Sequence, residues 1–221
     1  MGQTGGFSID FMCYGAHGGG KKCCLQHSRK KGFISIDADL VGHEAAENAK
    51  EKIVKEFGSL AEEKGISLLN DDGSLNRRAL GSLIFSSADL VAKQEAIVYP
   101  EISHIIEDFI KANEKKDLVI NATLLYKLPL IKKMQTVLYI DAPLLQRFLR
   151  AKKRDKMKNK QILDRFRRQK NLFANYKKCN ADIVRVWNTG TRQNLEKKIE
   201  KFLAECRQGI NVWNKKEHFG F

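Results

Sequence analysis

Apolar positions follow two alternating patterns along this chain of 221 residues. Short apolar runs predict buried strands, and longer segments with apolar residues three and four positions apart predict helices. The predicted strands are 7–14, 33–36, 117–121, 136–140 and 183–187. The predicted helices are 23–31, 40–57, 75–85, 88–97, 101–113, 144–153, 162–173 and 193–208. This alternation favours an α/β fold whose parallel sheet is covered by helices on both faces.

The helical stretch between residues 40 and 113 is too long for one crossover between neighbouring strands. We therefore expect it to stand partly off the sheet as a helical subdomain with room for a second substrate. The expected division is a core of 7–39 and 117–208, a helical acceptor-binding subdomain of 40–116 and an irregular tail of 209–221.

A glycine-rich turn joins the first predicted strand to the first predicted helix. Gly15, Gly20 and Lys21 match the phosphate-loop pattern Gly-(four residues)-Gly-Lys-[Ser/Thr], and Lys22 departs from it at the last position. Glycines let backbone N–H groups converge on an oxyanion, and the start of a helix directs further N–H groups there. A cation at a helix N-terminus costs about 0.3–1 kcal/mol, which a bound polyphosphate offsets. The pattern predicts a polyphosphate loop; the alternative is a glycine-rich turn with two solvated lysines.

Two carboxylates, Asp37 and Asp39, follow the second predicted strand. Ligands of open α/β sheets bind beyond the carboxyl ends of the strands. The pair therefore indicates a general base together with a carboxylate that orients magnesium. The alternative is that Asp39 caps the helix that begins at Leu40, and the two roles are compatible.

The chain is strongly basic, with 40 Lys and Arg against 26 Asp and Glu and a net charge of +14. Such an excess indicates polyanionic partners such as nucleotides, phosphorylated cofactors or nucleic acid. It is densest at 147–178, where Phe148, Phe166, Phe173 and Tyr176 have the spacing of a helix face rather than of a base-stacking sheet. Nucleic acid is therefore the less favoured partner.

The remaining composition excludes several classes. No apolar run is long enough to span a membrane, and the first residues lack the pattern of a signal peptide, so we expect a cytoplasmic protein. The five cysteines form no C-x-x-C pair, which argues against a disulfide framework or a zinc site. Cys23 and Cys24 open the helix after the loop, where the pKa of a thiol can fall; ordinary buried or half-buried thiols are the favoured interpretation.

Several short motifs resemble, in their order and spacing, the dephospho-coenzyme A kinase family over about residues 14–203. They are Gly20-Lys21, Gly32-Phe33, 36–40, 72–77, 96–102, 124–126, Arg154-Asp155, Arg165 with Gln169, and Ala181-Asp182 with 188–190. The resemblance implies a P-loop NTPase-type three-layer αβα fold with a five-stranded parallel sheet, a helical coenzyme A-binding subdomain and a lid at about 154–160. It also implies ATP-dependent phosphorylation of the ribose 3′-hydroxyl of dephospho-coenzyme A with Mg²⁺, in a monomer or small homo-oligomer.

The resemblance further implies roles for single residues. Asp39 matches the family's base for the 3′-hydroxyl, with weak, water-mediated metal contact; Arg154 matches its lid arginine, and Lys21 is the third catalytic residue. The implied ATP-binding residues are Gly15, His17, Gly18, Gly19, Gly20, Lys21, Lys22, Cys23, Asn188 and Gly190, the last two beside the adenine. The implied acceptor-binding residues are Asp37, Arg77, Tyr99 and Leu124.

The chain departs from the family at several of these positions. Lys22 replaces the Ser or Thr whose hydroxyl binds magnesium, and an ammonium group cannot ligate a cation. The other replacements are Tyr99 for a histidine, Asn121 and Lys127 for acidic residues, and Thr123 for a proline. We therefore expect weak or altered use of magnesium, with Lys22 supplying part of the missing charge. Two alternative functions stay open: a P-loop kinase for another nucleoside-like acceptor, and a divergent nucleotide- or RNA-binding P-loop homologue with weak or no kinase activity.

Overall fold

The computed structural model describes residues 10–15, 17–122, 125–127, 130–131, 134, 136–155, 158–179 and 182–208. The chain divides into two compact units. One unit is Met1–Asp37 with Asn113–Phe221, and the other is Ala38–Ala112. Each unit is described by itself below.

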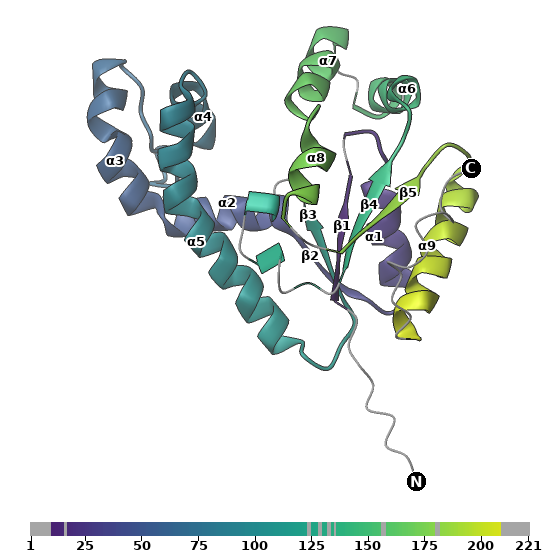
Figure 1. The fold of residues 1–221 in the computed structure, drawn as a ribbon. Coiled ribbons are helices and arrows are strands. Elements are labelled where there is room, and N and C mark those ends of the chain that lie inside the picture. The colour runs from purple at the N-terminus through teal and green to yellow at the C-terminus, as the bar shows by residue number, and fades with distance from the viewer. Residues whose placement is uncertain are drawn as a thin grey trace. The chain divides into compact units, whose positions relative to one another are not determined.

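A parallel sheet forms the centre of the first unit (Figure 1). Its strands are β1 (Asp10–Tyr14), β2 (Ile34–Asp37), β3 (Leu118–Ala122), β4 (Thr136–Asp141) and β5 (Ile183–Trp187). Their order is β2-β3-β1-β4-β5, and each neighbouring pair is parallel. The expected α/β class is confirmed. Because the strands are parallel, the carboxyl ends of β1, β2 and β3 lie at one edge of the sheet.

Helices cover both faces of this sheet (Figure 1). They are α1 (Lys21–Lys30) and α9 (Arg192–Arg207) on one face and α8 (Leu172–Lys177) on the other. α6 (Leu144–Asp155) and α7 (Asn159–Arg168) pack on each other in a separate small cluster that includes Ala151 and Phe166. Successive residues of β4 point to opposite faces, as the pleat of a strand requires. Leu138 is buried in one core cluster with Leu25 of α1 and Phe202 of α9. On the other face, the ring of Tyr139 lies 4.7 Å from that of Phe173 in α8, and burial raises the pKa of Tyr139 to about 12.

The second unit consists of helices. They are α2 (Ala38–Asn48), α3 (Lys50–Glu63), α4 (Arg77–Ile84) and α5 (Ala88–Ala112). Buried apolar side chains of all four helices form its interior, among them Val41, Ile53, Leu83 and Ile106. Within the described residues, no helix of either unit is long and apolar enough to cross a membrane.

Two predicted helix boundaries in this unit are wrong. The predicted helix 40–57 is divided at Ala49, which is 1% exposed and separates α2 from α3. The predicted helices 88–97 and 101–113 are one helix, α5, with Pro100 inside it. A proline inside a helix costs about 3 kcal/mol because it lacks an N–H donor. Here Pro100 is exposed while Val98 and Ile102 beside it are buried, so packing on both sides of the proline maintains the helix.

Burial of β4 makes a direct prediction for stability. Leu138→Ala should lower the free energy of unfolding by about 2–5 kcal/mol, because it removes a fully buried side chain from the cluster between the sheet, α1 and α9. Leu145→Ala is the matched control in the same unit, since Leu145 is 70% exposed, and should change it by less than about 0.5 kcal/mol. Urea unfolding followed by circular dichroism measures both. Equal effects of the two substitutions would contradict this description of the core.

Candidate functional site

The glycine-rich loop follows β1 and ends at the first residue of α1. Gly18 and Gly20 have φ values of +78° and +118°, a left-handed backbone that favours glycine. Gly20 immediately precedes α1, and its carbonyl accepts a hydrogen bond from the amide of Cys23 at 2.9 Å. Among the described residues, the amides of Gly19, Gly20 and Lys22 donate to no protein acceptor. Backbone N–H groups with these properties at a helix start suit the binding of an anion.

The loop is also closely surrounded by the rest of the first unit. A Cβ atom at Gly15 would lie 2.5 Å from the carbonyl oxygen of Ile140, and one at Gly18 would lie 2.5 Å from that of Arg147. A Cβ atom at Gly20 would lie 2.5 Å from Nδ2 of Asn188. Glycine is therefore required at three positions by the close approach of β4, α6 and the segment after β5.

Side chains from α6 and from the end of α7 hold the peptide groups of His17. The amide of His17 donates to Oε1 of Gln169, the residue that ends α7, at 2.8 Å. The carbonyl of His17 accepts from Nε of Arg147 at 3.0 Å. The guanidinium of Arg147 in turn lies 4.4 Å from the centroid of the Phe166 ring, a favourable cation–π distance. Both backbone groups of His17 are thus fixed by residues far away in the sequence.

Asn188 holds the loop from the other side. Its Nδ2 donates to the carbonyl of Gly19 at 2.8 Å, and its own amide donates to the carbonyl of Asp141 at 2.7 Å. Asn188 is only 7% exposed. The loop thus reaches the segment 188–190, where the sequence predicted an adenine site.

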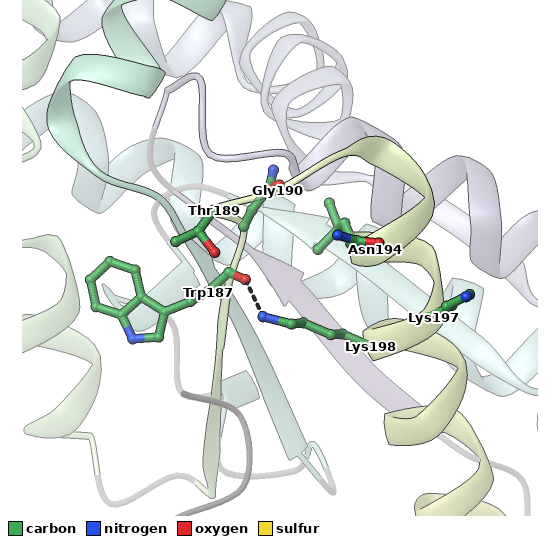
Figure 2. Close-up of a pocket in the computed structure, with 8 residues that line it drawn as sticks. Trp187, Thr189, Gly190, Asn194, Lys197 and Lys198 are labelled. Atoms are coloured by element: carbon green, nitrogen blue, oxygen red, sulfur yellow. Dashed lines mark hydrogen bonds between the residues drawn. The ribbon is translucent and has the colours of Figure 1, made fainter. Parts of the chain in front are cut away.

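A cavity of about 260 Å³ opens between that segment and α9. Its lining residues are Trp187, Asn188, Thr189, Gly190, Asn194, Leu195, Lys197 and Lys198. Figure 2 shows Lys198 reaching from α9 towards the carbonyl of Trp187, to which its Nζ donates at 2.8 Å. The indole of Trp187 points away from α9 in this view. Asn188 and Gly190, both predicted to lie beside the adenine, thus line one cavity together with Lys197 and Lys198 of α9.

The first turn of α1 carries the remaining residues predicted to bind ATP. Lys21 is half-buried, Lys22 is exposed and Cys23 is half-buried, with its Sγ 3.9 Å from Oε1 of Glu196. Burial raises the pKa of the Cys23 thiol, and this outweighs the lowering effect of Arg192. The helix start therefore does not activate this thiol, in agreement with the interpretation of an ordinary half-buried cysteine.

Asp37 and Asn121 form a polar pair at the same edge of the sheet. Asp37 ends β2 and accepts a hydrogen bond from Nδ2 of Asn121 in β3 at 3.0 Å. Asn121 is 2% exposed, and its Oδ1 has no hydrogen-bond partner in the described part of the chain. An amide can donate to the neighbouring carboxylate, whereas a second carboxylate at position 121 would repel it.

The other predicted residues lie elsewhere. Asp39 is exposed in the first turn of α2, Arg77 is exposed at the start of α4, and Tyr99 is half-buried in α5. These three belong to the helical unit and are described within it alone. Arg154 is exposed in the last turn of α6, which extends past the predicted end at 153, and Leu124 lies outside the described residues.

The sequence patterns missed Arg147, which contacts the loop at His17, and Arg150, which contacts the segment 188–190 after β5. Together with Arg154 they are spaced three and four residues apart on α6, which places them on one side of a helix. That spacing was a signal in the sequence, but it does not indicate what the side chains contact.

A parallel α/β sheet whose first strand leads through a glycine-rich loop into a helix N-terminus defines the class of P-loop nucleotide-binding proteins. The family model described as dephospho-CoA kinase matches residues 13–193. The chain belongs to the dephospho-CoA kinase family.

Individual relatives agree with this assignment. The dephospho-CoA kinase of Treponema denticola is 37% identical over 172 residues, which cover 76% of this chain and 77% of the relative. That of Treponema pallidum is 34% identical over 199 residues, covering 89% and 93%. The crystal structure of TT1252 from Thermus thermophilus superposes with a TM-score of 0.73 at 26% identity, covering 90% of this chain and 97% of that one. The likeness therefore extends over both units.

The close packing of the loop can be tested at Gly18. Gly18→Ala should abolish measurable nucleotide binding, because the new Cβ meets the backbone of Arg147 in addition to the strain of a positive φ. Gly65→Ala is the matched control: φ is +63° there and nothing lies within 4 Å of the new Cβ. It should cost about 1 kcal/mol of stability and leave binding intact. Calorimetric titration with ATP and thermal unfolding measure the two effects; ATP binding by Gly18→Ala at the wild-type affinity would contradict the packing described.

Proposed function

We propose that this protein transfers the γ-phosphoryl group of ATP to the ribose 3′-hydroxyl of dephospho-coenzyme A, the final step of coenzyme A biosynthesis. Membership of the dephospho-CoA kinase family supports the two substrates. The structural observation that supports the proposal is that the amides of Gly19, Gly20 and Lys22 lie at the start of α1 and donate to no acceptor among the described residues. The family assignment does not favour a homologue without kinase activity. Because ATP is a cytoplasmic metabolite, we infer a cytoplasmic location; a monomer or small homo-oligomer stays a prediction.

On the donor side, the amides from Gly18 to Lys21 bind the β- and γ-phosphates and the Lys21 ammonium neutralises charge there. Gly15 and His17 shape the loop, and Lys22 and Cys23 continue it into α1. The adenine occupies the cavity lined by Asn188 and Gly190. The volume and concave lining of this cavity support a small-molecule site.

On the acceptor side, Asp39 accepts the proton of the 3′-hydroxyl as that oxygen attacks phosphorus, the task of a general base. Only one residue, Ala38, separates Asp39 along the chain from Asp37 at the sheet edge. The helical segment 40–116 binds dephospho-coenzyme A through Arg77 and Tyr99. Asp37 and Leu124 of the core are the other two acceptor-binding residues that we propose. Arg154, in the proposed lid at about 154–160, stabilises charge on the transferred group. Positioning and charge neutralisation then provide most of the rate enhancement.

Magnesium is the second cofactor that we propose, and the donor groups of this chain fit it only in part. Within the described ranges, no three His, Cys, Asp or Glu side chains gather into a metal site. Asp37 and Asn121 present oxygen atoms at the sheet edge, but position 22 carries an ammonium instead of a hydroxyl. Magnesium can be held largely by phosphates and water, and when bound it would supply charge neutralisation. We therefore propose weak use of magnesium, with Asp39 contacting it through water.

Product analysis tests the proposed function. The protein should convert ATP and dephospho-coenzyme A into ADP and coenzyme A, detected by mass spectrometry with the phosphate assigned to the 3′ position by NMR.

Asp39→Asn should lower kcat by roughly 10²–10⁴-fold while changing the KM of each substrate little, because only proton acceptance is lost. Asp71→Asn, an exposed position in the same unit, is the control and should retain kcat. Wild-type kcat in Asp39→Asn would exclude Asp39 as the base.

The role of Lys22 is tested by the magnesium dependence of the rate. Lys22→Ser restores a hydroxyl that can ligate the ion, so half-maximal activity should require roughly tenfold less magnesium than in the wild type. Lys30→Ser removes the same charge from an exposed position of α1 and should leave the magnesium profile unchanged. Identical profiles for the wild type and Lys22→Ser would refute the proposal that Lys22 alters the use of the metal.

A further inference from the structure

Three consecutive carbonyl groups after β5 accept hydrogen bonds from side chains of α6. Nη1 of Arg150 donates to the carbonyl of Asn188 at 3.2 Å, and its Nη2 lies 3.4 Å from that of Gly190. Between them, Nε2 of Gln146 donates to the carbonyl of Thr189 at 3.1 Å. Oε1 of Gln146 also accepts from Nη2 of Arg150 at 3.2 Å, which fixes the guanidinium one turn along the helix. The segment 188–190 is therefore held by α6 through its backbone.

The same guanidinium orients the side chain of Asn188. Nη2 of Arg150 lies 3.4 Å from Oδ1 of Asn188, while Nδ2 of Asn188 donates to the carbonyl of Gly19 at 2.8 Å. A guanidinium can only donate and a carbonyl can only accept. The amide of Asn188 therefore satisfies both neighbours in one orientation only, with its oxygen towards Arg150 and its nitrogen towards the loop.

We propose that Arg150 is a positioning residue for the phosphate-binding loop and that it acts through Asn188. The inference deepens the proposed function, since it takes ATP as the ligand of that loop. Without the guanidinium, the backbone carbonyl and Oδ1 of Asn188 lose their donor. The side-chain amide of Asn188 can then rotate away from Gly19. The carbonyl of Gly19 then loses its restraint, and the neighbouring amides are no longer pre-organised for phosphate oxygens. Binding of ATP should weaken for this reason although Arg150 itself contacts no phosphate.

This role differs from that proposed for Arg154, four residues further along α6. Arg154 is exposed at the end of the helix, whereas the guanidinium of Arg150 is partly buried and is engaged with 188–190. Loss of Arg150 should therefore affect the affinity for ATP, and loss of Arg154 the rate of transfer. Gln146, which contacts both Arg150 and Thr189, belongs to the same arrangement.

Calorimetric titration with ATP alone, without an acceptor, is the primary measurement on the full chain. Arg150→Gln should raise the Kd for ATP roughly tenfold, because part of the binding free energy is then spent on ordering the loop, and Arg150→Lys should recover part of that loss. Asn188→Asp keeps an oxygen for Arg150 but removes the donor to Gly19, so it should weaken ATP to a similar degree. In the double variant Arg150→Gln/Asn188→Asp, the Kd for ATP should be no more than about twice that of the more severe single variant, because both substitutions break the same chain of contacts. Lys152→Gln, an equal loss of charge from an exposed position of α6, should change Kd less than about twofold.

Kinetics and stability distinguish positioning from a general structural role. The KM for ATP should rise in Arg150→Gln while the KM for dephospho-coenzyme A stays near its wild-type value, and the melting temperature should fall by only a few degrees. An unchanged Kd, a parallel rise of both KM values, or losses of affinity that multiply in the double variant would each overturn the proposal. If the wild type binds ATP but forms no coenzyme A, the proposed reaction fails and the titrations still decide the role of Arg150. If the wild type binds no ATP, both fail.

Discussion

The packing of backbone against backbone around residues 15–20 is the constraint on which the rest of the site depends. Gly15 lies against the carbonyl of Ile140 and Gly18 against that of Arg147, at distances that exclude any side chain. The amide of His17 donates to Gln169 and its carbonyl accepts from Arg147, while the carbonyl of Gly19 accepts from Asn188. The loop therefore has its shape from β4, α6, α7 and the segment after β5 before any ligand arrives. Such pre-organisation favours tight binding because less order has to be created on binding.

This arrangement explains part of the basic charge of the chain. The dense run of Lys and Arg at 147–178 falls on α6, α7 and α8. Arg147 packs on Phe166 and donates to His17, and Arg150 donates to the segment 188–190. These two cations serve the structure around the loop, whereas Lys22 and Arg154 are exposed and carry charge that a polyphosphate can neutralise. The charge of Arg147 and Arg150 thus has a structural use, and the proposed function gives Lys22 and Arg154 a different one.

The sequence predicted the sheet and the loop well because both depend on local patterns. Apolar runs identify strands, and the spacing of Gly15, Gly20 and Lys21 identifies the loop. It failed where packing between distant segments decides the outcome. Pro100 remains inside α5 because Val98 and Ile102 are buried beside it, and the role of Arg150 depends on Asn188, 38 positions away. No local pattern contains either contact. Asp39, Arg77 and Tyr99 stay predictions, since their roles were inferred from resemblance and their unit is described by itself.

A crystal structure with a non-hydrolysable ATP analogue tests the central claim most directly. The account predicts phosphate oxygens at about 3 Å from the amides of Gly18 to Lys21, with residues 15–20 and the contact between Asn188 and Gly19 unchanged. An analogue bound away from these amides, or a loop that straightens to receive it, would contradict the claim that this chain holds a pre-formed polyphosphate site.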